Sequence, residues 1–128
     1  MNHSNLLRFI VFIFMSIIIA SCTYEKIEEE EGLPENVSFQ NDLIPMFNAS
    51  CNSVGCHNDG GIPPDLSPAN AYKDLTSTAG MIDITTPENS ELYKRMVDAA
   101  QPMPISGLLS TYQSDQVLSW ITDGAIEN

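Results

Sequence analysis

The residues most able to do chemistry together are Cys51, Cys56 and His57, which lie in the segment 51–57, CNSVGCH. Two thiols followed at once by an imidazole are what covalent haem attachment requires: the thiols bond the two porphyrin vinyl groups, and the histidine becomes the proximal iron ligand. The usual spacing has two residues between the cysteines, and this chain has four. Because the vinyl positions are fixed, the extra residues must loop out, and Gly55 lies where that loop rejoins Cys56.

Two other interpretations of the cysteines stay open at this point. Cys51 and Cys56 could form a local disulfide, which is a stable bond outside the cytoplasm. They could also bind zinc together with His57, but zinc takes four ligands, so a carboxylate would have to complete the site. Haem c is the hypothesis that these three side chains satisfy without an added carboxylate.

Residues 1–21 are predicted to be an export signal. Arg8 precedes an apolar run over 9–19 that is short for a membrane span but typical of the hydrophobic region of a signal peptide. The run ends in Ile-Ala-Ser-Cys22, which resembles the cleavage motif of bacterial lipoproteins. That resemblance implies cleavage before Cys22 and lipidation of its thiol, and so a location in the cell envelope, facing the periplasm or the cell surface. An uncleaved membrane anchor is the alternative.

The chain is strongly acidic, with 17 Asp and Glu against five Lys and Arg and a formal net charge of −12. This charge excludes nucleic acid as a partner, because the phosphate backbone would repel the protein. A basic protein surface is the natural electrostatic complement. Residues 22–37 contain the run Glu28–Glu31 followed by Gly32 and Pro34, and we expect a flexible, solvated tether there.

The remaining segment, 38–128, is expected to form one small all-α domain, because apolar residues recur at helical spacing and no long alternating strand pattern is present. Ser38 or Asn41 is the expected cap of the first helix. Ser110 with Gln113 forms a capping box for the last helix, which Gly124 should close. The predicted helices cover about 39–50, 68–76, 88–98 and 110–123.

Two loops carry further candidates. After His57, a turn-rich segment could supply a backbone carbonyl, from Ile62 or Pro63, that accepts the imidazole Nδ1–H and fixes the ring tautomer. The loop before the last helix holds Met103 between Pro102 and Pro104. Residues before proline are forced into extended conformations, so this loop should be stiff. A thioether on a stiff loop is suited to bind the opposite side of a haem iron.

The order of these features resembles monohaem cytochrome c of the class I type, and most closely the small exported cytochrome c domains of bacterial lipoproteins. The similarity extends over about 37–126. It implies a class I-like helical domain wrapped around one covalent haem, with the first and last helices crossing beside it. It also implies thioether bonds at Cys51 and Cys56, His57 as proximal ligand and Met103 as distal ligand. Met46 and Met96 are expected in the core, and Met81 is the rival sixth ligand.

The function expected from this resemblance is that of a lipid-anchored, extracytoplasmic one-electron carrier, not an enzyme, working with redox partner proteins. An electron-transfer subunit of a larger assembly is a variant of that role. A peroxidase-like haem enzyme with an open sixth site is a second hypothesis, although Met103 and the absence of another histidine from residues 22–128 argue against it. A haem-free binding lipoprotein, stapled by a disulfide, is a third.

Overall fold

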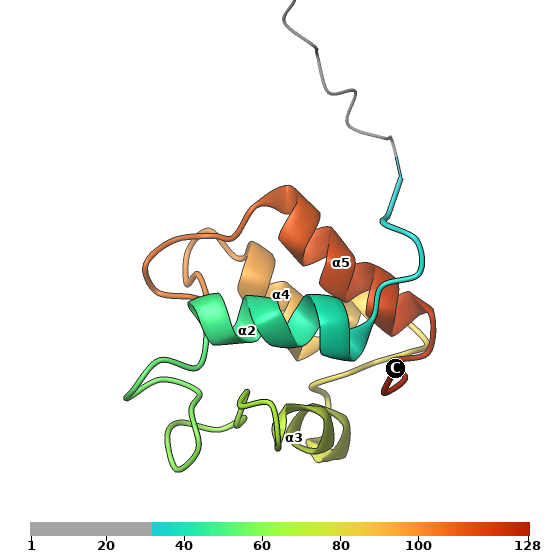
Figure 1. Cartoon of the computed structure of the whole chain (residues 1–128). Coiled ribbons are helices and arrows are strands. Elements are labelled where there is room, and N and C mark those ends of the chain that lie inside the picture. Colours follow the sequence, from blue (N-terminus) through green and yellow to red (C-terminus); the bar gives the residue numbers. More distant parts are fainter. Residues whose placement is uncertain (1–31) are drawn as a thin grey trace, which may run out of the picture. The chain divides into compact units, whose positions relative to one another are not determined.

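The computed structural model describes residues 32–128. The predicted signal peptide, Cys22 and the first part of the predicted tether lie outside the described residues. Within 32–128 all regular secondary structure is helical and no strand occurs, so the all-α prediction is confirmed for this part of the chain. In chain order (Figure 1) the elements are the π-helical turn η2 (Phe39–Leu43), α2 (Ile44–Ser50), α3 (Ala71–Ser77), the 3₁₀ turn η3 (Pro87–Asn89), α4 (Glu91–Val97) and α5 (Thr111–Thr122).

The first predicted helix, 39–50, is confirmed as the continuous pair η2 and α2. Ser38, not Asn41, is its cap: the Ser38 hydroxyl accepts the backbone N–H of Asn41 at 3.1 Å. The first turn is wound more widely than an α-helix, since the N–H of Ile44 donates to the carbonyl of Phe39 five residues before it.

The last predicted helix is also confirmed, as α5. The Ser110 hydroxyl accepts the N–H of Gln113 at 3.3 Å, and the Gln113 side-chain oxygen accepts the N–H of Ser110 at 3.1 Å, which completes the capping box. Gly124 follows the helix with φ of +95°, a left-handed conformation that glycine adopts at little cost. Both ends of α5 are therefore specified by local sequence.

The two middle helices differ from their predictions. The helix expected over 68–76 begins only at Ala71, with Asn70 as its N-cap. Asp65 explains the late start, because its carboxylate accepts the N–H of Ser67 at 2.8 Å and the side-chain amide of Asn70 at 2.7 Å, and so holds this stretch in a turn.

The helix expected over 88–98 is divided into η3 and α4. Ser90 separates the two pieces: it is fully buried, and its hydroxyl accepts the N–H of Asp83 at 2.8 Å. Leu92 and Met96 of α4 are buried, whereas Val97 at its end is exposed.

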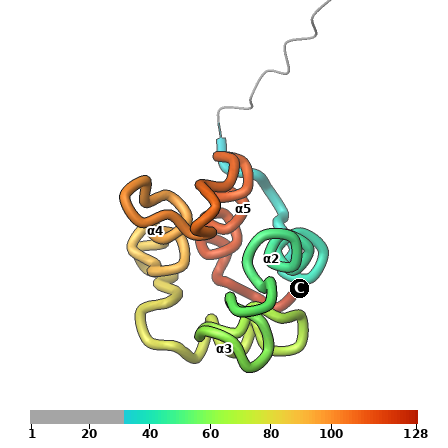
Figure 2. The backbone as a smooth tube through the Cα atoms, turned by 90° about the vertical axis from the view of Figure 1, so that its left-hand side faces the viewer, coloured from blue at the N-terminus to red at the C-terminus, as the bar shows by residue number. Residues whose placement is uncertain are grey.

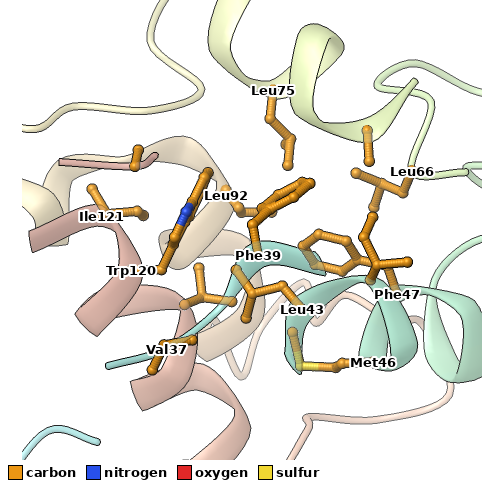
Figure 3. Packing of buried hydrophobic residues seen from close by; sticks show 14 of the residues in the cluster. Val37, Phe39, Leu43, Met46, Phe47, Leu66, Leu75, Leu92, Trp120 and Ile121 are labelled. Atoms are coloured by element: carbon orange, nitrogen blue, oxygen red, sulfur yellow. The ribbon is translucent and has the colours of Figure 1, made fainter. Parts of the chain in front are cut away.

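The core joins the first and last helices through aromatic side chains (Figure 3). Phe39 and Trp120 are both fully buried, with ring centroids 5.0 Å apart. The ring centroids of Phe47 and Tyr72 lie 6.3 and 5.3 Å from that of Phe39, both in edge-to-face arrangements. The indole N–H of Trp120 donates to the carbonyl of Ile126 at 2.8 Å, so the one polar atom of the ring is satisfied. The first and last helices thus pack directly on each other.

The segment before the first helix is held against α5. The Ser119 hydroxyl donates to the carbonyl of Pro34, and Val37 is buried. The side-chain oxygen of Asn128 accepts the N–H of Phe39 at 2.7 Å. The end of the predicted tether is therefore held to the helical unit at Pro34 and Val37 and is not a free, solvated spacer there.

Two long loops leave the helices on the same side of this unit, at the left in Figure 1 and toward the viewer in Figure 2. The first is 51–70, after α2, and the second is 98–110, between α4 and α5. These are the two loops in which the sequence places its candidate haem residues. Along the described part of the chain, no helix has the length and apolar character needed to cross a membrane.

Candidate functional site

The cysteine loop folds back on itself directly after α2. Cys51 ends that helix, with its N–H donating to the carbonyl of Phe47 at 2.8 Å. The chain then turns, so that the N–H of Cys56 donates to the carbonyl of Ser53 at 2.9 Å and the N–H of His57 donates to the carbonyl of Cys51 at 3.2 Å. The two cysteines and the histidine are thus brought onto one short closed loop.

The residues between the cysteines loop out, as expected from their number. Val54 is 96% exposed at the tip of the turn. Gly55 has φ of +84°, the left-handed conformation that returns the chain to Cys56. The side chain of Asn58 supports this return, because its oxygen accepts the N–H of Gly55 at 3.0 Å.

The next turn packs backbone against backbone around Cys56. The N–H of Ile62 donates to the carbonyl of Cys56 at 2.7 Å, and the N–H of Gly61 donates to the carbonyl of Asn58 at 2.7 Å. Gly61 has no room for a side chain, because a Cβ at that position would lie 2.3 Å from the Cys56 carbonyl oxygen. The two adjacent glycines, 60 and 61, are the feature of the sequence that indicates this close approach. From the sequence alone they were taken only as part of a turn.

His57 is oriented by two backbone carbonyls. Its Nδ1 lies 3.0 Å from the oxygen of Ile62 and 3.1 Å from the oxygen of Pro64. The prediction of Ile62 is confirmed, and that of Pro63 is wrong, since the neighbouring Pro64 makes the contact. Carbonyl oxygens only accept hydrogen bonds, so Nδ1 must carry the proton, and in the neutral ring Nε2 keeps a free lone pair. This is the tautomer that a histidine ligand bonded through Nε2 requires.

The two thiols are free and partly buried. Burial raises the pKa of the Cys51 thiol to about 11, and the nearby Cys56 adds to the shift. Cys51 is therefore a protonated thiol at neutral pH. Among residues 32–128, no three His, Cys, Asp or Glu side chains are grouped as ligands of a metal ion. Covalent haem requires no such grouping, because the thiols bond the porphyrin edge and only the imidazole reaches the iron.

The four methionines of the described chain have different environments. Met46 and Met96 are buried in the core, as predicted. Met81 is partly buried and packs against that core. Met103 is 38% exposed, outside the core cluster and its packed margin. It is thus the methionine of these four that has no structural role in the core.

The Met103 loop is attached to the end of α4. The N–H of Met103 donates to the carbonyl of Arg95 at 3.0 Å, and the N–H of Gly107 donates to the carbonyl of Pro104 at 3.0 Å. Pro102 and Pro104 are half-buried on either side of the methionine. The stiffening role of the two prolines was predicted from the sequence. The contact of Arg95 with Met103 was not, because nothing in the local pattern connects these two residues.

Large apolar side chains are exposed on both loops. Three of them follow one another within a few residues on the methionine loop. A porphyrin has the apolar faces that such side chains would contact. The exposed residues are Val54 and Ile62 on the cysteine loop, and Met103, Ile105 and Leu108 on the methionine loop.

The described unit has two surface hollows. One, of about 500 Å³, is lined by α4 and by Asp98 and Gln101 at the start of the methionine loop. The other, of about 380 Å³, lies between residues 33–36 and the end of α5. Neither hollow includes the cysteines or His57.

Comparison with known proteins returned no relative for this chain. No protein-family model matches the sequence. No curated protein matches it. No solved structure matches its fold. The interpretation of the site therefore depends on the residues of the two loops and on the contacts that orient them.

Proposed function

We propose that the chain is an extracytoplasmic one-electron carrier of the class I cytochrome c type, with a single covalent haem c. The observation that carries the proposal is the orientation of His57, whose Nδ1 faces two carbonyl oxygens and whose Nε2 is thereby left with a lone pair. Cys51 and Cys56 lie on the same closed loop with free thiols. Two unpaired thiols support haem attachment, and an imidazole with a lone pair on Nε2 supports proximal ligation.

Met103 is proposed as the distal ligand. Its support is its exposure on a loop flanked by two prolines, on the same side of the helical unit as the cysteine loop (Figure 2). The other three described methionines lie in the core or against it, so recruiting one of them would disrupt packing. Haem bound here would supply an iron that gains and loses one electron. The role of the protein is to hold both axial side chains so that little has to move during that change.

The proposal extends to the redox partners of the protein and to its location in the cell. The net charge of −12 favours redox partners with a basic docking surface and disfavours nucleic acid. Lipidation at Cys22 would attach the domain to a membrane of the cell envelope. An iron with protein ligands on both faces suits electron transfer, not catalysis at an open site.

Covalent attachment is tested by producing the chain together with a haem c assembly system. Acid–acetone extraction should leave the haem on the polypeptide, and the pyridine haemochrome should report two thioether bonds. Cys51→Ala and Cys56→Ala should each reduce that number to one. Haem that extracts freely from the parent chain would refute the proposal, and a haem-free chain with a 51–56 disulfide would favour the stapled binding lipoprotein.

The sixth ligand is tested by comparing Met103→Ala with Met81→Ala. The ferric parent should show the weak charge-transfer band that His/Met ligation produces near the red end of the visible spectrum. Met103→Ala should abolish that band and lower the reduction potential, because the soft thioether no longer favours ferrous iron. The opposite pattern would move the ligand to Met81. A five-coordinate parent spectrum would favour the peroxidase-like hypothesis.

Anchoring is tested with Cys22→Ser. This change should release the protein from the membrane fraction and leave the haem spectrum unaltered, because the lipid site and the helical unit are separated by the predicted tether. A variant that resists a salt wash and stays in the membrane would favour the uncleaved signal helix.

A further inference from the structure

The loop that carries Met103 is fixed to α4 by more than its backbone. Arg95, near the end of α4, uses its carbonyl to accept the N–H of Met103 at 3.0 Å. Its guanidinium Nη1 donates to the side-chain oxygen of Gln101 at 3.2 Å, two residues before the methionine. One residue of α4 therefore holds the loop at two points, one on each side of Pro102.

The guanidinium is itself held from the other side. Its Nε donates to the carboxylate of Glu91 at 2.6 Å, one helical turn earlier. This hydrogen bond, the largest of several causes, lowers the pKa of Glu91, so the carboxylate is ionised at neutral pH. A guanidinium presents its donors in a rigid planar fork, which lets Arg95 bond Glu91 and Gln101 at the same time.

We infer that Glu91, Arg95 and Gln101 form a clamp that sets how often the Met103 loop opens and the thioether leaves the iron. The inference rests on the proposed function, because it gives Met103 its place as distal ligand. Arg95 and Gln101 are positioning residues in this scheme and touch neither the haem nor its iron. Opening of the loop requires the Gln101 hydrogen bond to break, while α4 stays folded.

The structure offers a matched control. Lys94 carries the same charge as Arg95 on the same helix and also approaches Glu91, at 3.6 Å. Lys94 lines the hollow of about 500 Å³ together with Arg95 and Gln101. Its ion pair is with Glu91 and not with a residue of the loop. Lys94→Ala thus removes a positive charge and a Glu91 contact and leaves the Arg95–Gln101 hydrogen bond in place.

The experiment measures imidazole binding to the ferric protein, because imidazole can occupy the iron only when Met103 has left it. Apparent affinity then scales with the fraction of open loops. Loss of one solvent-exposed, charge-assisted hydrogen bond should raise that fraction about threefold in Gln101→Ala. Lys94→Ala should leave the affinity unchanged, and Gln101→Glu, which keeps an acceptor for Arg95, should stay close to the parent. The thermal midpoint should be the same in all four proteins.

A second readout does not involve the haem. Hydrogen exchange of the Met103 amide, followed in the same full-length samples, should accelerate by the same factor of about three in Gln101→Ala and not in Lys94→Ala. Unchanged imidazole affinity in Gln101→Ala, beside a large increase in Met103→Ala, would overturn the inference. Unchanged exchange would show that no clamp exists, whatever binds the iron. A parent chain that carries no haem would refute the proposed function and the release of Met103 from iron. In that case, hydrogen exchange of the Met103 amide still decides whether the clamp exists.

Discussion

Replacement of Gly61 by alanine is the most direct test of the cysteine-loop geometry. The new Cβ would lie 2.3 Å from the Cys56 carbonyl oxygen, 2.7 Å from the side-chain oxygen of Asn58 and 2.9 Å from its carbonyl oxygen. Two of these three atoms belong to the backbone, so rotation of a side chain cannot relieve the overlap. Either Gly61 or the Cys56 peptide must move, by about 1 Å to reach ordinary contact.

That movement acts on hydrogen bonds that hold the loop closed. The Cys56 carbonyl accepts the N–H of Ile62 at 2.7 Å, and the Asn58 carbonyl accepts the N–H of Gly61 at the same distance. Weakening these two bonds costs about 1 kcal/mol each, and relief of the overlap costs about 1–2 kcal/mol more. Gly61→Ala should therefore lower the free energy of unfolding by about 3 kcal/mol. It should also shift the Ile62 carbonyl that orients His57.

The neighbouring glycine is the control. Gly60 has φ of +72° and nothing within 4 Å of the position that a Cβ would occupy. Gly60→Ala should cost only the left-handed conformation, about 1 kcal/mol. Both variants are compared with the parent by urea unfolding and by the fraction of chain that carries covalent haem. If Gly61→Ala is no less stable than Gly60→Ala and attaches haem equally well, the close backbone packing described for this loop is wrong.

Three further changes test the helical unit. Ser110→Ala removes the hydroxyl that accepts the Gln113 N–H and should destabilise the chain by about 1 kcal/mol in urea unfolding, whereas Ser106→Ala in the preceding loop should have little effect. Trp120→Phe leaves the Ile126 carbonyl without its donor and opens a small cavity, so a loss of about 2 kcal/mol is expected, and an unchanged thermal midpoint would contradict it. The Asp83 carboxylate accepts a hydroxyl and two N–H groups from Thr85 and Thr86, and these bonds lower its pKa below the ordinary 3.8. The ionised Asp83 carboxylate therefore stabilises the fold above pH 3.8, and this contribution is lost as pH falls through the lower pKa of the folded state. The difference in unfolding free energy between the parent and Asp83→Ala should stay constant near neutral pH and shrink only in strong acid.

The helix ends that could be predicted are those determined by adjacent residues. Ser110 and Gln113 are three residues apart and bond each other, and Gly124 directly follows the last residues of α5, so their roles follow from the sequence alone. The start of α3 could not be predicted in this way. Asp65 lies outside the expected helix, and its carboxylate holds the Ser67 N–H and the Asn70 side chain in a turn ahead of α3.

The same distinction applies to the candidate site. The Ile62 contact to His57 was predictable, because a turn of a few residues brings the chain back to the ring. The choice of Pro64 over Pro63 depends on the direction of each carbonyl, which a run of residue types does not specify. Arg95 was unpredictable for another reason: its contacts to Gln101 and Met103 depend on how the loop folds back along α4, which the helical pattern of residues does not specify.

The attachment of residues 34–37 to α5 has a mechanical consequence. A pull on the chain ahead of Pro34 is borne first by its contact with Ser119 and by the buried Val37, on the side of the unit opposite the two loops (Figure 1). The force therefore enters through α5 and through the start of the first helix, which Asn128 also holds at Phe39. Cys51 lies at the far end of that helix, away from the point where the chain is loaded.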